Sequence, residues 1–237
     1  MHLTRFRINA ARLGGRSLLA SPQRMHAAVM SSFAGALPSM PGVPGDSRVL
    51  WRVDRNAKAE VLLYIVSEER PDLTHLVEQA GWPTTATWDT YDYADFLRRL
   101  ESGSTWAFRL TANPVHHIRR KDGEPTKRTA HVTPRHQMAW LLARQETSGF
   151  RVLETPPERR RLPQGDEFQL TVRDERRHRF EKSDERGDRR TQVPLVTVTF
   201  DGRLEVTDPV ALARTLISGI GKAKAYGCGL MTLAKAG

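Results

Sequence analysis

The chain has 237 residues and a mass of 26.8 kDa, enough for one large domain or two small ones with a buried core. Hydrophobic residues make up 39% and charged residues 27%, an ordinary globular composition that argues against wholesale disorder. No apolar run of ~18 residues is available to cross a membrane, and no signal-peptide centre is recognisable, so we expect a cytoplasmic protein. A single cysteine, Cys228, excludes an internal disulfide and a multi-cysteine zinc site.

The net charge of +10 is distributed unevenly along the chain. Residues 1–58 carry nine Lys/Arg and two acids, residues 59–108 carry three and nine, and residues 109–237 carry twenty-five and sixteen. Two basic blocks therefore flank an acidic stretch, which indicates a polyanionic partner, with nucleic acid ahead of an acidic membrane. No basic amphipathic helix supports membrane binding.

The first half of the chain predicts strand, helix, strand, strand and short helix. These elements are expected over residues 4–8, 22–37, 49–53, 61–66 and 72–80. Ser21-Pro22 supplies an N-cap and a first helical proline, and apolar residues at spacings of three and four follow it up to Pro38. The order is that of a ferredoxin-like unit.

The second half predicts a similar unit. Strands are expected over residues 105–111, 192–200 and 203–206, with Asp201-Gly202 as the turn between the last two. Helices are expected after Thr133-Pro134 and after Asp208-Pro209. We therefore predict an α+β fold with two tandem ferredoxin-like (RRM-like) domains, over residues 1–87 and 104–237, joined by a polar, acidic linker over 88–103.

The most specific local feature is the glycine-rich segment 219–230, which follows the last predicted helix. It holds Gly219, Gly221, Gly227 and Gly229 together with Lys222 and Lys224, and no acid occurs from residue 209 to the end. Glycines let backbone N–H groups approach a phosphate closely, and lysines neutralise its charge. A helix C-cap with a glycine-rich return into an edge strand explains the same residues equally well.

These features together resemble the CasE family, the type I-E CRISPR endoribonucleases that process repeat RNA within the Cascade complex. The stretches that carry the resemblance occur in family order: residues 1–9 and 21–26, 109–114, 139–141 with 149–150, 200–206 and 219–230. Residues 38–48 and 151–192 add nothing distinctive. The resemblance implies cleavage at the base of a repeat hairpin by 2′-OH attack, without metal or cofactor, leaving a 2′,3′-cyclic phosphate. It also implies that the product stays bound and that other Cascade subunits are partners.

His26 lies at the edge of the apolar stripe of the first helix. On the residues alone, such a histidine is more often a boundary residue with a satisfied hydrogen bond than a catalyst. In the resemblance it matches the catalytic histidine, and an imidazole can accept or donate a proton near neutral pH. The family pattern often has tyrosine three residues earlier, where this chain has Gln23, which does not titrate. Ser31, Ser32 and Tyr226 are alternative sources of a second proton-transfer group.

The predicted RNA contacts come from basic residues around three segments and from the glycine-rich segment. They are Arg24, Arg119, Arg120, Lys121, Lys127, Arg128, Arg173, Arg176, Arg177, Gly219, Gly221, Lys222, Lys224 and Gly227. Residues 173–190 hold eight basic and six acidic residues, which is typical of a solvated loop or hairpin. In the family, a basic hairpin at this place enters the groove of the RNA stem.

The remaining candidates are weaker. His116-His117 lies in a basic stretch that is either a solvated loop or a phosphate contact. The other histidines, namely His2, His75, His131, His136 and His178, show no metal-ligand spacing and are interpreted as structural. Cys228 is expected to be a small buried residue. The rival functions are a catalytically inert RNA-hairpin-binding subunit on the same fold, which Gln23 favours, and a generic double-stranded-RNA binder.

Overall fold

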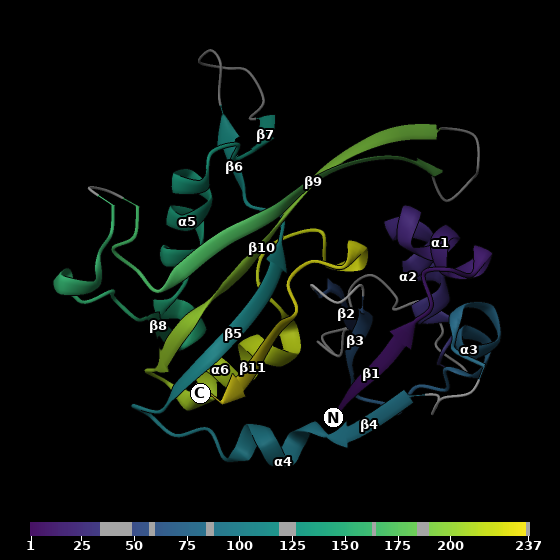
Figure 1. The fold of residues 1–237 in the computed structure, drawn as a ribbon, viewed down its shortest axis with the longest axis horizontal. Coiled ribbons are helices and arrows are strands. Elements are labelled where there is room, and N and C mark those ends of the chain that lie inside the picture. Colours follow the sequence, from purple (N-terminus) through teal and green to yellow (C-terminus); the bar gives the residue numbers. More distant parts are fainter. Residues whose placement is uncertain are drawn as a thin grey trace.

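The computed structural model describes residues 1–33, 49–56, 60–83, 88–118, 127–162, 165–183 and 190–235. Its helices and strands form two units that lie side by side (Figure 1). Within these residues no helix is long and apolar enough to span a membrane. Each unit repeats one plan, a four-stranded antiparallel path with helices on one face.

The first unit places its strands in the sheet order β2-β3-β1-β4. Its elements are β1 (His2–Ile8), α1 (Leu13–Ala20), α2 (Pro22–Met30), β2 (Leu50–Arg55), β3 (Val61–Ser67), α3 (Thr74–Ala80) and β4 (Trp88–Asp92). The alternation in β1 turns Thr4, Phe6 and Ile8 inward and Arg5 and Arg7 outward. This is the strand-helix-strand-strand-helix-strand plan of a ferredoxin-like domain, which confirms the predicted fold class.

The second unit has the corresponding order β11-β5-β10-β8, with β9 paired along β10. Helix α4 (Tyr93–Arg98) leads into it. Its elements are β5 (Thr105–Ala112), β6 (Val115–Ile118), β7 (Lys127–Ala130), α5 (Pro134–Leu142), η1 (Glu146–Ser148), β8 (Phe150–Val152), η2 (Pro157–Arg159), β9 (Leu170–Ser183), β10 (Arg190–Val206), α6 (Pro209–Ser218), η3 (Lys224–Tyr226) and β11 (Met231–Lys235). The β9–β10 hairpin extends toward α1 and α2 of the first unit (Figure 1).

Three helix starts are confirmed, because Ser21, Thr133 and Asp208 each cap a helix whose first residue is proline. The first predicted helix ends earlier than expected, at Met30, and the rest of its range lies largely outside the described residues. A separate helix, α1, precedes it and was not predicted.

The predicted turn at Asp201-Gly202 is wrong. Strand β10 runs unbroken through both residues, and Gly202 pairs with Phe108 of β5. A Cβ at Gly202 would lie 2.5 Å from the Gln169 carbonyl oxygen and 2.9 Å from the Phe108 ring, so glycine is there for close strand approach. Asp201 accepts hydrogen bonds from Arg109 and Arg173 on the neighbouring strands.

Residues 88–103, expected to be a linker, include β4 and α4. Strand β4 adds to the free edge of β1, where Asp89 pairs with Arg5 and Thr90 hydrogen-bonds Thr4. Its polar composition suits an edge strand with one solvated face, and this is why the sequence pattern did not reveal it. The remaining domain boundaries stay a prediction.

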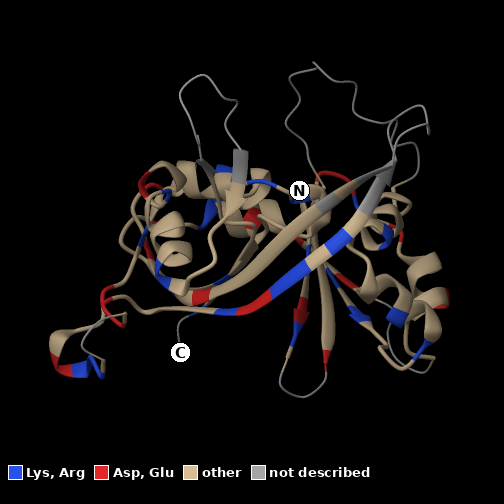
Figure 2. Ribbon diagram, turned by 90° about the horizontal axis from the view of Figure 1, so that it is seen from above, with Lys and Arg blue, Asp and Glu red and all other residues tan. Residues whose placement is uncertain are grey.

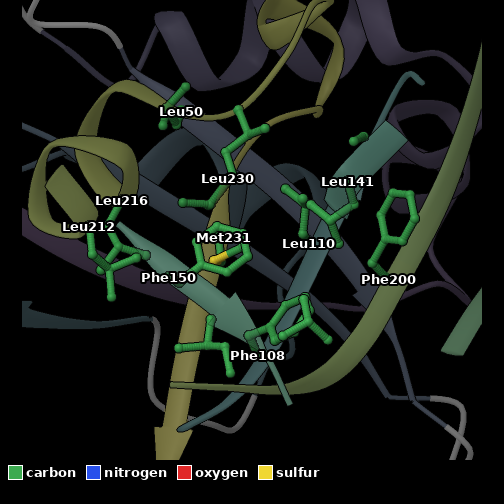
Figure 3. Close-up of a cluster of buried hydrophobic side chains, with 14 of the residues drawn as sticks. Leu50, Phe108, Leu110, Leu141, Phe150, Phe200, Leu212, Leu216, Leu230 and Met231 are labelled. Atoms are coloured by element: carbon green, nitrogen blue, oxygen red, sulfur yellow. The ribbon is translucent and has the colours of Figure 1, made fainter. Parts of the chain in front are cut away.

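The two units share a core. One buried cluster lies between the first sheet and α1, α2 and α3. The other fills the second unit but also includes Leu50 and Val66 of the first sheet, and Figure 3 shows Leu50 beside Leu230. The open face of the first sheet is therefore buried against the second unit, which fixes α2 relative to β9 and β11.

Candidate active site and nucleic-acid interface

Helix α2 positions His26 at the junction of the two units. Ser21 caps the helix by accepting from the Arg24 backbone N–H, while Met25 and Val29 anchor it in the core. His26 lies one turn after Pro22 on the same side of the helix and is half-buried. Burial lowers the pKa of His26, and its Nδ1 atom has no hydrogen-bond partner in the described part of the chain. The ring is thus largely neutral at pH 7 and able to accept a proton.

The glycine-rich segment lies directly against α2 through η3. Gly227 has a φ of 79°, and a Cβ there would be 2.7 Å from the Trp51 ring of β2. Gly219 ends α6, and a Cβ there would be 3.0 Å from Leu50. The segment returns the chain from α6 to the edge strand β11. Gly219 and Gly227 are needed there because a side chain at either position would collide with the first unit.

Of the three groups considered as a second proton-transfer residue, only Tyr226 lies in the cleft described below. Its ring packs on Phe180 of β9, with centroids 4.6 Å apart. The hydroxyls of Ser31 and Ser32 instead donate to the Ala27 and Ala28 carbonyl oxygens in the last turn of α2. Geometry therefore favours Tyr226.

A cleft opens between the two units beside α2. Its first wall comes from α1, α2 and β2, and its second from β5, β9, β10 and η3. It encloses about 740 Å³ of empty space, counted out to its open mouth. His26 is not among the lining residues, but Pro22 and Met25 of the same helix are.

A β-bulge in β9 decides which arginines reach the cleft. Arg173 pairs with Thr199 and Arg176 with Thr197, so three residue steps on β9 match two on β10. Asp174 lies within the bulge and has a φ of 54°. The bulge puts Arg173 and Arg176 on one face of the hairpin, although their spacing in a regular strand would place them on opposite faces. Figure 2 shows the blocks of basic and acidic residues along β9.

Arg177 lies on the other face of β9, where it donates to Glu175. It lines a second cavity with residues 129–132 and part of β10. The structure thus separates Arg177 from Arg173 and Arg176, with which it was grouped in the sequence.

The cleft arginines differ in their partners. Arg109 and Arg173 both donate to Asp201, and Arg109 also approaches Asp54. These bonds raise the pKa of Arg109 and, against the effect of burial, lower that of Asp201. Arg55 and Arg176 make no hydrogen bond or ion pair within the described residues. Burial, followed by the charge of Arg176, lowers the pKa of Arg55.

The other predicted contacts are dispersed. Arg24 lies on the side of α2 nearly opposite His26 and donates to the Ser17 hydroxyl. Lys222 is exposed in the loop, and Lys224 Nζ donates to the Ser218 carbonyl oxygen at the end of α6. A Cβ at Gly221 would meet the Trp140 ring. Arg119, Arg120 and Lys121 lie outside the described residues, and of Lys127 and Arg128 only the backbone, in β7, is described.

Sequence reasoning missed Arg55 and His178 as cleft residues. Arg55 is the last residue of β2, and His178 faces the cleft from β9, with Nε2 3.5 Å from the Thr197 hydroxyl. Alternation along β9 after the bulge was the signal that could have placed His178, but the segment read as a charged loop. His75 is structural as expected, since its Nε2 lies 2.9 Å from the Ala28 carbonyl oxygen.

Within the described residues, no three His, Cys, Asp or Glu side chains are grouped so as to hold a metal ion. His116, His131 and His136 stack in series, with centroids 4.3 and 5.9 Å apart, without such a grouping. Cys228 is buried as predicted, and burial raises the pKa of its thiol to about 12. A neutral buried thiol is no nucleophile.

Comparison with known proteins gives consistent matches over nearly the whole chain. Residues 1–235 match the family model described as CRISPR associated protein. The chain is 34% identical over 236 residues to the CRISPR-associated endoribonuclease Cse3 of Thermus thermophilus, covering 99% of this chain and 100% of that protein. It is similar to CRISPR endoribonuclease Cse3 bound to a 19-nt RNA, with a TM-score of 0.73 and 27% identity over 99% of this chain and 100% of that one. It is also similar to Thermus thermophilus Cse3 with an RNA representing a pre-cleavage complex, with a TM-score of 0.71 and 29% identity over 98% of each chain.

Proposed function

Because this chain belongs to the CasE family of CRISPR-associated endoribonucleases, we propose that it cleaves CRISPR repeat RNA at the base of a hairpin. The observation that carries the proposal is the position of His26, a half-buried imidazole on a helix packed between the glycine-rich loop and a cationic cleft. The Cse3 relatives are similar over the full chain in their RNA-bound forms.

The proposed reaction is an in-line attack of a ribose 2′-oxygen on the adjacent phosphorus. His26 accepts the 2′-OH proton, the bond from phosphorus to the 5′-oxygen breaks, and that oxygen takes up a proton as it leaves. The products are a 2′,3′-cyclic phosphate and a 5′-hydroxyl end. Basic side chains stabilise the extra negative charge of the phosphorane. Each step uses a protein acid, base or cation, so the reaction is proposed to proceed without metal.

Tyr226 is the proposed donor of the second proton. It lies in the cleft wall on the segment packed against α2, and Phe180 fixes its ring. Gln23, where the family pattern often has tyrosine, is exposed and cannot titrate.

The RNA stem is proposed to lie along the basic face that includes β9, with Lys222 in contact with the phosphate backbone of the RNA. Arg176 lies on the cleft face of the β9–β10 hairpin and Arg177 on the other face, so the two arginines contact different parts of the RNA. We further propose that the product stays bound and that the protein acts as a Cascade subunit, as the family assignment implies.

Cleavage of a repeat hairpin in EDTA tests the proposal. We expect wild-type protein to cut once and leave a cyclic phosphate, and the variant His26→Ala to bind the hairpin without cutting it. His136→Gln, which changes an exposed histidine on α5, is the matched control and should cut normally. Cleavage that survives His26→Ala, or that stops in EDTA, would contradict the mechanism.

The second candidate is a catalytically inert RNA-hairpin-binding subunit, which the exposed Gln23 favours. It predicts tight binding with intact RNA under wild-type protein. A generic double-stranded-RNA binder instead predicts equal affinity for unrelated stems, so the same assay with an unrelated hairpin separates all three functions.

A further inference from the structure

The cleft between the units has two chemically different walls. Leu19, Pro22 and Val53 are half-buried on the first wall, over the buried Trp51 and Met25. The second wall presents cations and hydroxyls from β9 and β10. Arg173, Arg176, His178, Thr197 and Thr199 lie on that wall, together with the carboxylate of Asp174. The first wall is mainly apolar but also carries Asp54 and Arg55, and the second wall is mainly cationic. This combination suits a ligand with a flat apolar part and an anionic part.

The cations without a hydrogen-bonded carboxylate come from both units, although the charge of Asp174 partly offsets that of Arg55. Asp201 neutralises Arg109 and Arg173 through short hydrogen bonds, whereas Arg55 and Arg176 have no carboxylate bonded to them in the described part of the chain. Arg55 and Arg176 are close enough that the charge of one lowers the pKa of the other. Two like charges facing each other across a cleft are stabilised when an anion binds between them.

His178 extends this cationic pair. His178 lines the same cleft as Arg55 and Arg176. Burial lowers the pKa of its imidazole, and the charges of Arg176 and Arg55 lower it further. Neutral imidazole donates one hydrogen bond, and its protonation would be favoured by a bound anion. Arg55, Arg176 and His178 line one cleft and come from both units, so we call them the bridging cluster.

The size of the cleft limits the ligand. Its 740 Å³ of empty space extends out into the open mouth, so the enclosed part is smaller and suits a single base rather than a duplex. An unpaired base can stack or pack on an apolar wall whatever its identity. The cleft also lies on the side of α2 that carries Pro22, one turn from His26.

We propose that the cleft binds one unpaired nucleotide beside the scissile linkage, with its phosphate on the bridging cluster and its base against the apolar wall. The assignment rests on the proposed function, because it presumes an RNA whose cut site lies near His26. It adds a single-stranded element to a substrate otherwise held as a stem. Because Arg55 belongs to the first unit and Arg176 to the second, the phosphate also joins the units.

Two RNAs test the assignment in the His26→Ala background, where cleavage does not interfere with binding. One is the repeat hairpin with three unpaired nucleotides on each side of the stem, and the other is the same stem-loop trimmed to its paired ends. We expect the flanked RNA to bind about tenfold tighter, as the stacking of one base can supply. Replacing each flanking nucleotide in turn by an abasic one should abolish the gain at one position only.

The double variant Arg55→Gln/Arg176→Gln should remove the preference for flanked RNA and lower its slope of log affinity against log salt by roughly 0.7, as for one single-strand phosphate. Neither arginine is hydrogen-bonded within the described residues, so the variant should fold, as circular dichroism will verify. Arg214→Gln is the matched control, because Arg214 is exposed on α6 at the helix-covered face of the second sheet. It should keep both the preference and the slope.

Equal affinity for the two RNAs, or a flank preference that survives the double variant, would overturn the cleft assignment even if wild-type protein cleaves the hairpin. Conversely, an uncut hairpin under wild-type protein would refute the proposed function. The cleft assignment would then still stand if the double variant alone lost the flank preference.

Discussion

His26 and His178 are both half-buried imidazoles near the cleft, and their surroundings differ. Burial alone lowers the pKa of His26, whereas His178 also faces the charges of Arg176 and Arg55. A phosphate on those arginines would offset their effect on His178. The pKa of His26 has no such charged determinant, so its role as a base follows from its burial on α2.

The lowered pKa of His26 predicts the pH dependence of cleavage. Protonated imidazole cannot accept the 2′-OH proton, so kcat/KM should rise with pH through a value below the ordinary ~6.5 and level off by neutral pH. Single-turnover cleavage of the hairpin from about pH 5 to 8 measures this limb. A limb centred above 6.5 would show that the imidazole is not the base or is stabilised in its charged form.

Removal of the Tyr226 hydroxyl tests the proposed acid. Tyr226→Phe keeps the ring packed on Phe180 and should lower the single-turnover rate about 100-fold, with little change in hairpin affinity. Tyr91→Phe, at an exposed position on β4, is the control and should leave the rate unchanged. An unaltered rate for Tyr226→Phe would assign leaving-group protonation to another group.

At the scale of elements, the sequence predicts what is local. Ser21, Thr133 and Asp208, each followed by proline, begin helices, because cap and proline act within one turn. The sequence predicted two strands where the structure has the single strand β10, because Asp-Gly is a strong turn signal. In the structure Asp201 and Gly202 pair with β5 and β9. The bulge in β9 was equally hidden, and it decides that Arg176 reaches the cleft while Arg177 does not.

Gly202 provides a test of this continuous strand. Gly202→Ala should destabilise the fold by roughly 1–3 kcal/mol, because the added Cβ meets the Gln169 carbonyl oxygen and the Phe108 ring. Urea unfolding monitored by circular dichroism measures the loss. Gly103→Ala is the comparison, since it has a positive φ but nothing within 4 Å and should cost about 1 kcal/mol from backbone strain alone. A smaller loss at Gly202 than at Gly103 would argue against the close strand approach.

At the scale of the whole molecule, the site depends on contacts between residues far apart in the chain. Arg55, Arg176 and Tyr226 come from three separate segments, and only the packing of the two units brings them to one cleft. The family resemblance of the sequence singled out His26 as a candidate, and composition singled out the glycine-rich loop; their roles stay predictions. Arg24, close to His26 in sequence, lies on the opposite side of α2, so proximity along the chain was a poor guide.

The side chain that fixes this packing is Arg52, which is only 1% exposed between the units. It donates to both carboxylate oxygens of Asp54, to the carbonyl oxygens of Arg109 and Leu230, and to the Thr232 hydroxyl. The guanidinium of the first sheet thereby satisfies acceptors on β5 and β11. A buried charge with these bonds specifies one relative position of the units.

Arg52→Met should therefore lower the free energy of unfolding by about 3–5 kcal/mol, because it leaves the buried Asp54 carboxylate without its main partner. Arg52→Met/Asp54→Leu should recover much of that loss, since a hydrophobic pair leaves no uncompensated charge. Arg98→Met, in an exposed pair with Asp95, should change stability by roughly 0–1 kcal/mol. Urea unfolding of the three variants measures these differences.

RNA binding by the double variant then shows what Arg52 contributes to the cleft. If this variant is stable but binds flanked RNA no better than trimmed RNA, Arg52 sets the geometry of the cleft as well as the stability of the fold. If the variant keeps the preference for flanked RNA, apolar packing around Leu50 suffices to hold the units in place.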